Sequence, residues 1–504
     1  MIQTSYNPDV LSCLANLSND EVFTPPNLVN DILDLLPEEL WRNPSAKFLD
    51  PFTKSGVFLR EMAKRLMIGL EDKFPDKQIR VNHIFKNQLY GIAISELTSL
   101  LSRRSVYCSK IANGKYSICS SFDNEQGNII YNKLQHSWVN GKCSFCGASQ
   151  DVYERNDSLE TYAYHFIHTT NPEKIFNMKF DVIVGNPPYQ LNDGGGTGSS
   201  AKPIYNHFIE QAKKLNPRYL SMIIPARWYS GGKGLDEFRN KMLNDKRIRT
   251  LVDFADSRDC FPGVDIAGGV CYFLWDRENE GLCQVETVRN NDVIKSERYL
   301  NEFETFVRDN LAIGIIHKVK EKNNLFMDSV VSSRMPFGLV SSVRPEKKGD
   351  LDLITSAGNG KISSKKITSG LELIKKWKVL LSKASNDHGG QPDKDGKRRI
   401  FSRIEVMPPN SVCTESYLVV GNYETEHEAL NMAGFLRTKF CRFLVSTILL
   451  TQNITKGKFV FVPSLNMNES WTDDKLYANY NLSLEEINFI DELIRPIYIA
   501  ETED

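Results

Sequence analysis

The chain has 504 residues, of which 41% are hydrophobic and 25% charged, and its formal net charge is −1. A chain of this length has room for two or three domains, and no apolar run approaches the roughly 20 residues that span a bilayer. These features argue against a membrane-spanning or low-complexity protein. The start of the chain lacks the basic and then apolar pattern of a signal peptide, and the ten cysteines are scattered. We therefore expect a reducing, cytoplasmic location.

The near-neutral net charge conceals two segments of opposite charge. Residues 341–410 contain fifteen Lys and Arg against eight Asp and Glu, whereas residues 469–504 contain two against ten. One basic segment on a near-neutral chain is the distribution expected of a DNA-contacting domain. A merely solvated surface shows the same pattern, so both interpretations stay open.

The first two predicted elements follow each other closely. The apolar spacing of residues 28–36 predicts a helix that Thr24 can cap, with Pro25 in its first turn. A short strand over 47–52, a polar turn and a helix through Leu59 to Leu66 come next. A strand–turn–helix unit of this kind places backbone N–H groups and a helix N-terminus around a cofactor.

A second strand is predicted over residues 88–96, followed by a helix over 97–104. Strands in this position usually end near a carboxylate that binds ribose hydroxyl groups of the cofactor, and Glu96 is the nearest acidic residue. Glu96 is equally suited to stabilise the start of the helix through the helix dipole. Two candidates remain for contact with a cofactor base, Asp123 and the segment 166–169.

The stretch 136–147 contains a Cys-x-x-Cys-Gly turn. Cys143 and Cys146 direct two sulfur atoms at one point, which is typical of half a zinc site. His136 is the best-placed third ligand. The fourth is left open among Cys108, Cys119, His165 and His168. Two free structural thiols are the alternative, whereas a redox motif would require a strand–helix setting that this region lacks.

Residues 180–185 form an apolar run that ends abruptly at Asn186-Pro187-Pro188-Tyr189. Two prolines cannot continue a strand, so a buried strand should stop here and present a rigid polar loop. The Asn186 amide and the Pro187 carbonyl can hold a flat amino group, and the Tyr189 ring can stack on the same substrate. A simple strand-ending turn is the alternative.

The glycine-rich stretch 192–200 is either a flexible connection or a lid. A helix is predicted over 203–215, and strands over 219–225, 248–254 and 270–275. Strands that alternate with helices over the first three hundred residues predict an α/β fold with a doubly wound, Rossmann-like sheet.

These motifs resemble those of the gamma-class N6-adenine DNA methyltransferases of the Eco57I-like restriction-modification methylase family. Residues 186–189 are similar to motif IV of that family, and residues 50–56 to its motif I, in which Lys54 replaces the usual first glycine. Ala93 departs from the family's usual acidic residue. The resemblance implies S-adenosylmethionine as cofactor. It assigns cofactor contacts as follows: Phe23, Thr24, Pro25, Asp50, Pro51, Gly56, Glu96 and Asp123. It assigns Asn186, Pro187, Pro188 and Tyr189 to catalysis, and it implies that Tyr189 and Phe261 stack on the extruded base.

Past residue 300, short strands, glycine turns and basic clusters dominate. The basic residues interleave with polar ones, which suits phosphate contact; they are Arg344, Lys347, Lys348, Lys361, Lys365, Lys366, Lys375, Lys376, Lys378, Lys397, Arg398 and Arg399. An amphipathic helix is predicted over 432–444. The layout of residues 320–465 resembles the target-recognition half of bacterial adenine methyltransferases, and an acidic helical tail follows.

The sequence thus predicts a methyltransferase domain over 1–300 with a small zinc-binding insertion at about 105–170. A C-terminal α+β target-recognition domain with the acidic helical tail is expected over 301–504. The expected function is transfer of a methyl group from S-adenosylmethionine to adenine N6 in double-stranded DNA, within a restriction-modification or phage-defence system. Cleavage would then require a separate restriction or helicase subunit as partner. Two rivals remain: a catalytically decayed DNA-binding specificity subunit, and a protein glutamine N5-methyltransferase.

Overall fold

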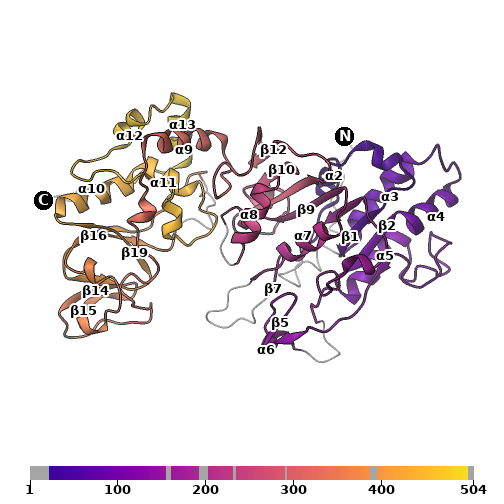
Figure 1. Ribbon diagram of the computed structural model, residues 1–504, viewed down its shortest axis with the longest axis horizontal. Helices are drawn as coiled ribbons and strands as arrows, with labels where there is room; N and C mark the ends of the chain where they lie inside the picture. The colour runs from indigo at the N-terminus through magenta and orange to yellow at the C-terminus, as the bar shows by residue number, and fades with distance from the viewer. Residues whose placement is uncertain are drawn as a thin grey trace. The chain divides into compact units, whose positions relative to one another are not determined.

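The computed structural model describes residues 22–154, 161–191, 202–230, 234–289, 292–385, 393 and 395–497. The chain divides into two compact units, Met1–Glu304 and Thr305–Asp504 (Figure 1). In the described part of the chain, no helix combines the length and apolarity needed to span a lipid bilayer.

The first unit is built on a nine-stranded sheet with the order β13-β12-β10-β11-β9-β6-β1-β2-β3. In chain order its strands are β1 (Phe48–Thr53), β2 (Leu89–Ala93), β3 (Ile129–Ile130), β6 (Val182–Gly185), β9 (Tyr219–Pro225), β10 (Ile248–Phe254), β11 (Val270–Asp276), β12 (Cys283–Arg289) and β13 (Asp292–Arg298). The predicted strands near 48, 89, 182, 219, 248 and 270 are all confirmed.

The strand directions determine where a site can form. Strands β1, β2, β3, β6 and β9 pair in parallel, whereas β11 runs antiparallel between β9 and β10. The polar loops after β1, β2 and β6 therefore leave the same edge of the sheet, where ligands of open α/β sheets bind. A mixed sheet with helices on both faces agrees with the α/β class predicted from the sequence.

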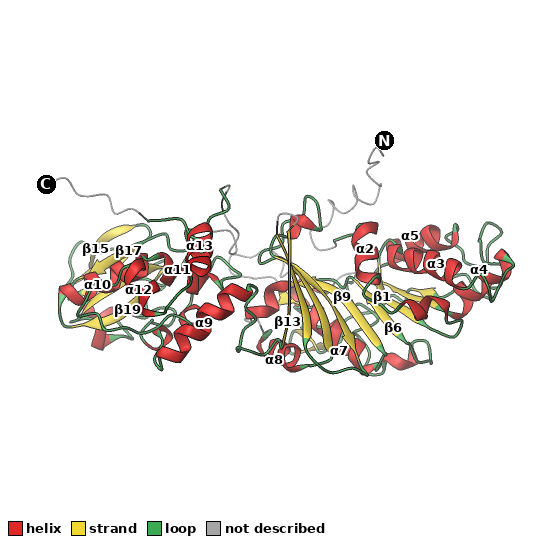
Figure 2. Cartoon of the chain, turned by 90° about the horizontal axis from the view of Figure 1, so that it is seen from above, coloured by secondary structure: helices red, strands yellow, loops and turns green. Residues whose placement is uncertain are grey.

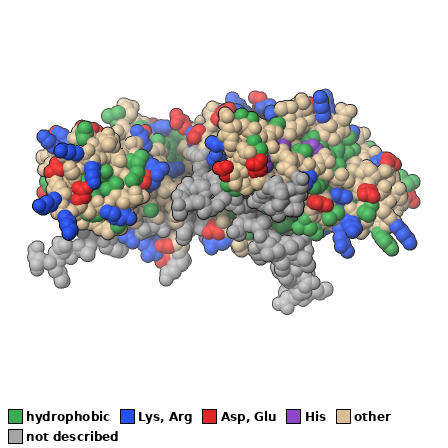
Figure 3. Space-filling model, turned by 90° about the horizontal axis from the view of Figure 1, so that it is seen from below, with side chains coloured by type: hydrophobic (Ala, Val, Ile, Leu, Met, Phe, Trp, Pro, Cys, Tyr) green, Lys and Arg blue, Asp and Glu red, His purple; other side chains and the backbone are tan. Residues whose placement is uncertain are grey.

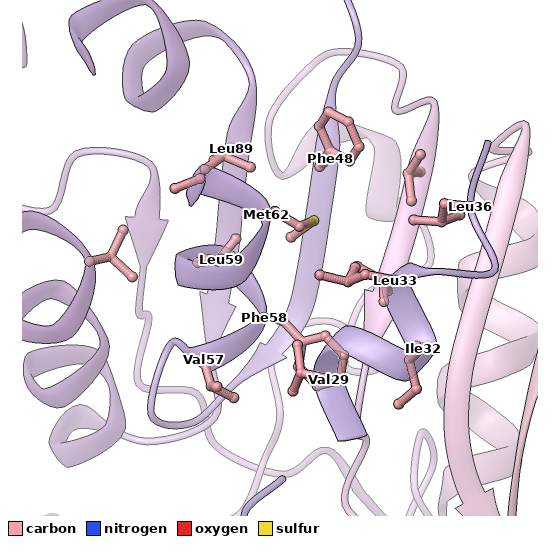
Figure 4. Packing of buried hydrophobic residues seen from close by; sticks show 14 of the residues in the cluster. Val29, Ile32, Leu33, Leu36, Phe48, Val57, Phe58, Leu59, Met62 and Leu89 are labelled. Carbon is pink, nitrogen blue, oxygen red and sulfur yellow. The ribbon is translucent and has the colours of Figure 1, made fainter. Parts of the chain in front are cut away.

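Helices cover both faces of the sheet, with α2, α3 and α5 on one side and α7 and α8 on the other (Figure 2). The helices of this unit are α2 (Pro26–Leu33), α3 (Val57–Gly69), α4 (Lys77–Asn87), α5 (Glu96–Tyr107), α6 (Gln150–Tyr153), α7 (Tyr205–Lys214) and α8 (Asp236–Asn244). Ile32 and Leu33 of α2 pack with Phe58 and Met62 of α3 and with Phe48 of β1 (Figure 4). All five side chains are buried. This shared apolar layer fixes both helices against the sheet.

The insertion is smaller than the sequence predicts. The last residues of helix α5, which ends at Tyr107, and the strand Ile129–Ile130, which joins the main sheet beside β2, fall within the predicted range 105–170 but belong to the main fold. A two-residue strand is too short to leave a periodic signal in the sequence. The insertion proper contains the hairpin β4 (Trp138–Val139) and β5 (Lys142–Cys143), followed by α6. A second small hairpin pairs β7 (Gln190–Leu191) with β8 (Lys202–Pro203), and the glycine-rich stretch between them lies outside the described residues.

The prediction that Thr24 caps the first helix is wrong. Helix α2 begins at Pro26, and its N-cap position is Pro25, which has no side-chain oxygen to offer. The first helical hydrogen bond runs from the Val29 amide to the Pro25 carbonyl. The Thr24 hydroxyl is consequently available for a different contact, with Asn186.

The second unit is α+β. Two three-stranded sheets, β15-β14-β18 and β17-β16-β19, form its centre. In chain order its elements are α9 (Asn310–Lys322), β14 (Leu351–Thr355), β15 (Gly358–Ile362), β16 (Trp377–Ser382), β17 (Ile404–Met407), β18 (Ser411–Cys413), β19 (Tyr417–Tyr423), α10 (Glu426–Arg437), α11 (Lys439–Ser446), α12 (Asp473–Asn479) and α13 (Leu484–Leu493).

The single helix predicted over 432–444 is in fact two. Thr438 has an extended backbone, and its hydroxyl accepts a hydrogen bond from the Cys441 amide, so it caps the start of α11. Both helices bury an apolar face, so the apolar periodicity continues across Thr438. The sequence pattern therefore does not reveal the break between the two helices.

Candidate active site

Asn186 follows directly after β6, and its side chain is only 3% exposed. The amide nitrogen Nδ2 donates to the Val22 carbonyl and to Thr24 Oγ1, both at 3.1 Å. Both N–H groups of the amide are therefore engaged, which fixes its orientation. The oxygen Oδ1 accepts no hydrogen bond from any described residue. A buried, unsatisfied acceptor costs stability and is often retained because a ligand satisfies it.

The segment that holds Asn186 is also bound by Lys54. The Lys54 ammonium, 7% exposed, donates to the same Val22 carbonyl at 3.0 Å. The sequence marks Lys54 only as a departure from the expected glycine. Its φ is not positive, whereas that of Gly56 is +79°. The position thus tolerates a side chain without backbone strain, and that side chain connects the turn after β1 to residues 22–24.

Asp50 lies on β1 beside the end of β6. Its Oδ1 accepts from the Phe52 amide at 3.2 Å, and a Cβ added at Gly185 would approach this oxygen to 2.8 Å and the Phe52 ring to 2.6 Å. The three residues are thus in close contact. Burial raises the pKa of Asp50 to about 7, although the Phe52 amide, Thr53 and Lys54 each oppose that shift. Pro51 is buried next to it.

Gly56 lies where the turn after β1 meets α5. A Cβ at this position would come within 3.0 Å of Val106 Cγ2 and 3.1 Å of Ser102 Cα. With its positive φ, the position therefore requires glycine. Gly56 is also the N-cap of α3 and supplies no side-chain cap, so the first-turn N–H groups of that helix receive no hydrogen bond from the cap residue.

Tyr189 and Phe261 belong to one buried apolar cluster, with exposures of 8% and 1%. Burial raises the pKa of Tyr189 well above its usual value, and Asn186 is among its polar neighbours. The Tyr189 hydroxyl forms no hydrogen bond within the described ranges. The structure thus brings Tyr189 to Asn186, whereas the Phe261 ring is enclosed in the core. Pro187 and Pro188 are buried between Asn186 and Tyr189.

Not all of the remaining candidates lie at the same edge of the sheet as Asn186. Phe23 and Pro25 are half-buried and flank Thr24. Glu96 is exposed in the first turn of α5, just past the carboxyl end of β2. Asp123 is not brought to the site. It pairs with Lys86 at 3.0 Å, and Lys86 precedes the start of β2, which is the opposite edge of the sheet.

The alternative segment, 166–169, does approach the site. The Phe166 ring contacts the Phe52 ring edge-on at a centroid distance of 6.4 Å. Phe208 of α7 completes the group, 5.4 Å from Phe52 and 6.5 Å from Phe166. Of the two segments that the sequence leaves open, only 166–169 is thus packed against β1, the strand that carries Asp50.

The structure brings His136, Cys143 and Cys146 together with His168. One ligand atom from each lies within 4.8 Å of all the others. The other rivals for the fourth position, Cys108, Cys119 and His165, are not in this cluster. Cys108 is exposed, and the Cys119 thiol lies 3.4 Å from Ser121 Oγ.

The basic residues of the second unit are not all available to a ligand. Lys378 is fully buried, and its ammonium donates to the carbonyls of Lys376 and Pro408, with its pKa lowered to about 8 by burial. Lys361, Lys366 and Lys376 pair with acidic residues. Within the basic segment 341–410, Lys347, Lys348, Lys365 and Lys375 are exposed and form no ion pair with another described residue. Lys and Arg side chains are prominent on the face of this unit in Figure 3.

Comparisons with known proteins agree with this geometry. The family model for Eco57I restriction-modification methylases matches residues 87–261, which include Asn186 to Tyr189. A curated protein from Mycoplasma pneumoniae described as an uncharacterized adenine-specific methylase is 40% identical over 310 residues, which cover 55% of this chain and 72% of that protein.

Two solved structures illustrate the more distant matches. A nuclease-deletion mutant of the Type ISP restriction-modification enzyme LlaGI in complex with a DNA substrate mimic is matched with a TM-score of 0.48 and 11% identity, over 99% of this chain and 50% of that one. A modification subunit of a putative type I restriction enzyme from Vibrio vulnificus YJ016 is matched with a TM-score of 0.35 and 12% identity, over 56% and 51%. The chain spans about half the length of these proteins. From the motif geometry, the family model and the identity to the curated methylase, we conclude that the chain belongs to the Eco57I-type family of adenine-specific restriction-modification methylases.

Proposed function

We propose that this protein transfers the methyl group of S-adenosylmethionine to N6 of adenine at a specific site in double-stranded DNA. It would act as the modification component of a restriction-modification or phage-defence system. The observation that carries the proposal is the buried Asn186 amide, whose nitrogen is fully engaged and whose oxygen has no partner among the described residues. An exocyclic amino group is a donor that this oxygen can accept from.

We propose that the cofactor binds at the edge of the sheet where the loops after β1, β2 and β6 leave it. Gly56 leaves the first-turn N–H groups of α3 without a side-chain cap, and the exposed Glu96 lies at the carboxyl end of β2, suited to ribose hydroxyl groups. We assign Asp50, Pro51 and the segment Phe23–Pro25 to the remaining contacts. Phe166 replaces Asp123 in our proposal as a residue near the cofactor base. When bound, S-adenosylmethionine supplies a methyl group on a positively charged sulfur.

The protein's own groups then orient the target base. Extrusion of an adenine from the duplex costs a few kcal/mol. Asn186 Oδ1 would accept one amino hydrogen and the Pro187 carbonyl the other, which draws the nitrogen lone pair out of conjugation with the ring. Tyr189 would hold the base by stacking, with Phe261 behind it in the core. Orientation of the two reactants supplies most of the acceleration, because no covalent enzyme intermediate is needed.

We predict that Asn186→Ala lowers the methylation rate at least about 100-fold, comparable to the loss of one key polar group in other enzymes. Binding of DNA should survive. Asn186→Asp retains an acceptor oxygen but cannot donate to Val22 and Thr24, so its rate should lie between those of wild type and Asn186→Ala. Radiolabelled methyl transfer to duplex DNA measures all three. Wild-type activity in Asn186→Ala would refute the proposed role of the amide.

Two rival functions are separated by simple assays. A protein glutamine methyltransferase would use Asn186 to hold a side-chain amide, so it would methylate glutamine peptides and not DNA. A catalytically decayed specificity subunit would show no saturable heat on titration with S-adenosylmethionine. We expect saturable binding and DNA as the acceptor.

We propose that the second unit recognises the DNA target. Its exposed lysines without ion-pair partners suit phosphate contacts, and its α+β sheets offer a rigid support for base-reading loops. DNA cleavage would then fall to a separate restriction or helicase subunit. The insertion that carries His136, Cys143 and Cys146 takes no part in this chemistry, and we propose that it holds a structural zinc ion.

A further inference from the structure

We propose that His136, Cys143, Cys146 and His168 form a complete tetrahedral zinc site, and that the bound ion fixes a wall of the active site. The second half of this inference rests on the proposed function. The four side chains come from two segments of the insertion, the β4–β5 hairpin region and the stretch 161–169. Three of them are buried and His168 is half-buried.

Three of the six separations between the ligand atoms agree with one central ion, and the other three are at most 4.8 Å. Zinc binds sulfur at about 2.3 Å and nitrogen at about 2.0 Å, so tetrahedral geometry puts a sulfur and a nitrogen about 3.5 Å apart and two nitrogens about 3.3 Å apart. Cys143 Sγ lies 3.6 Å from His168 Nε2, and Cys146 Sγ lies 3.5 Å from His136 Nδ1. The two imidazole nitrogens are 3.3 Å apart. All three distances agree with those of a tetrahedral shell.

The imidazole rings are held in the tautomers that a metal requires. His136 Nε2 faces the Thr161 carbonyl at 2.6 Å, and His168 Nδ1 faces the Tyr164 carbonyl at 2.8 Å. A carbonyl only accepts, so these nitrogens carry the hydrogens, and the opposite nitrogens direct lone pairs at the centre of the cluster. Carbonyl acceptors of this kind are the usual second partners of metal-bound histidines. Two lone pairs that face each other at 3.3 Å repel unless a cation lies between them.

Charge balance also favours zinc. On binding, each thiol gives up its proton to solvent and becomes a thiolate, so the two negative charges neutralise Zn²⁺ and the buried site has no net charge. The arrangement without metal is a pair of thiols that donate to the two imidazoles. That alternative leaves the contact between the histidine nitrogens unexplained.

The zinc-bound segment leads directly to the active site. Gln211 of α7 donates to the carbonyls of Phe166 and Thr169, at 3.1 and 2.7 Å, and so attaches the residues around His168 to the main fold. The Phe166 ring then packs against Phe52, which touches the position of Gly185. Removal of the metal should therefore loosen the support of β1, the strand that carries Asp50.

The site is tested first by its metal. Protein purified without chelators should contain one zinc per chain by elemental analysis, and cobalt exchanged into the site should give the visible absorption of tetrahedral Co²⁺ with thiolate ligands. His168→Ala should lose the metal, whereas His165→Ala, the neighbouring histidine outside the cluster, should keep it. His168→Cys should restore binding. Absence of stoichiometric zinc in the wild type, together with failure to take up cobalt, would overturn the proposal.

The link to the active site is tested by cofactor affinity. Removal of zinc from the whole protein, or His168→Ala, should weaken binding of S-adenosylmethionine several-fold in calorimetry, and added zinc should restore the chelated wild type. Phe166→Ala should weaken cofactor binding to a similar degree while zinc stays bound. Zinc-free protein with unchanged cofactor affinity would overturn the link. A zinc-loaded protein that binds no cofactor would instead contradict the proposed function.

Discussion

At the scale of single residues, the active-site edge contains a carboxyl group whose ionisation is costly. Asp50 is 3% exposed, and burial raises its pKa to about 7 from 3.8. As the pH rises, Asp50 therefore ionises at a lower pH in the unfolded chain than in the folded protein. The contribution of Asp50 to stability is therefore fully present below about pH 4 and is lost progressively as the pH rises through about 7.

This shift predicts a pH-dependent effect of Asp50→Asn, which cannot ionise. The melting temperature of the variant should rise relative to that of the wild type between pH 5 and pH 8. The underlying difference in the free energy of unfolding changes by at most about 1.4 kcal/mol per pH unit below pH 7. Thermal melts of the cofactor-free protein measure this difference. Asp72→Asn, at an exposed position, should show no such trend. A difference that does not vary with pH would contradict a raised pKa.

The amide of Asn186 shows a second effect at this scale. The residues that hold its nitrogen lie far earlier in the chain, with a separation of 164 positions between Asn186 and Val22. Lys54 donates to the same carbonyl, so one backbone oxygen joins the start of the chain, the turn after β1 and the end of β6. The position of the Asn186 amide thus depends on Lys54, whose side chain has no role in the family motif.

At the scale of elements, the approach of α3 and α5 is limited by Gly56. Its φ of +79° and the contacts that a Cβ would make with Ser102 and Val106 are two separate penalties. Gly263 has φ +81° but no described atom within 4 Å of such a Cβ, so it carries only the first penalty. Substitution of Gly56 and of Gly263 therefore distinguishes the cost of backbone strain from the cost of crowding between helices.

We predict that Gly56→Ala destabilises the protein more than Gly263→Ala, by about 1–3 kcal/mol, the usual cost of overpacking. It should also weaken binding of S-adenosylmethionine, because the start of α3 would shift. Urea denaturation measures the first effect and calorimetry the second. Equal destabilisation by the two variants would show that α5 moves away from the added methyl group at no cost in free energy.

At the scale of the whole molecule, the proposed division of labour puts the chemistry in the first unit and DNA recognition in the second. A quadruple variant with alanine at Lys347, Lys348, Lys365 and Lys375 should therefore bind DNA more weakly. The slope of log K against log salt should flatten by about one for each phosphate that the variant no longer neutralises, and the rate at saturating DNA should stay near wild type.

The control removes two exposed lysines of the first unit, Lys73 and Lys77. That double variant should keep the wild-type salt dependence. Binding titrations over a range of salt concentrations compare the three proteins. An unchanged slope in the quadruple variant would show that DNA lies elsewhere on the protein.

The sequence by itself determined the features that depend on neighbouring residues. Apolar runs located β1, β6, β9, β10 and β11, and at β6 and β9 the run ends at a glycine or a proline. The same local signals located the loop at Asn186 and the pair Cys143 and Cys146. These predictions needed no knowledge of what lies across the sheet.

Only the tertiary structure decided which distant groups meet. It selected His168 among four rivals as the residue nearest the cysteine pair, and it removed Asp123 to the opposite edge of the sheet. It gave Thr24 to Asn186 instead of to its own helix. It also buried Lys378 within a basic segment that the sequence presents as uniform. The physical reason is the same in each case: hydrogen bonds and burial depend on neighbours in space, and residues tens of positions apart leave no shared pattern in the sequence.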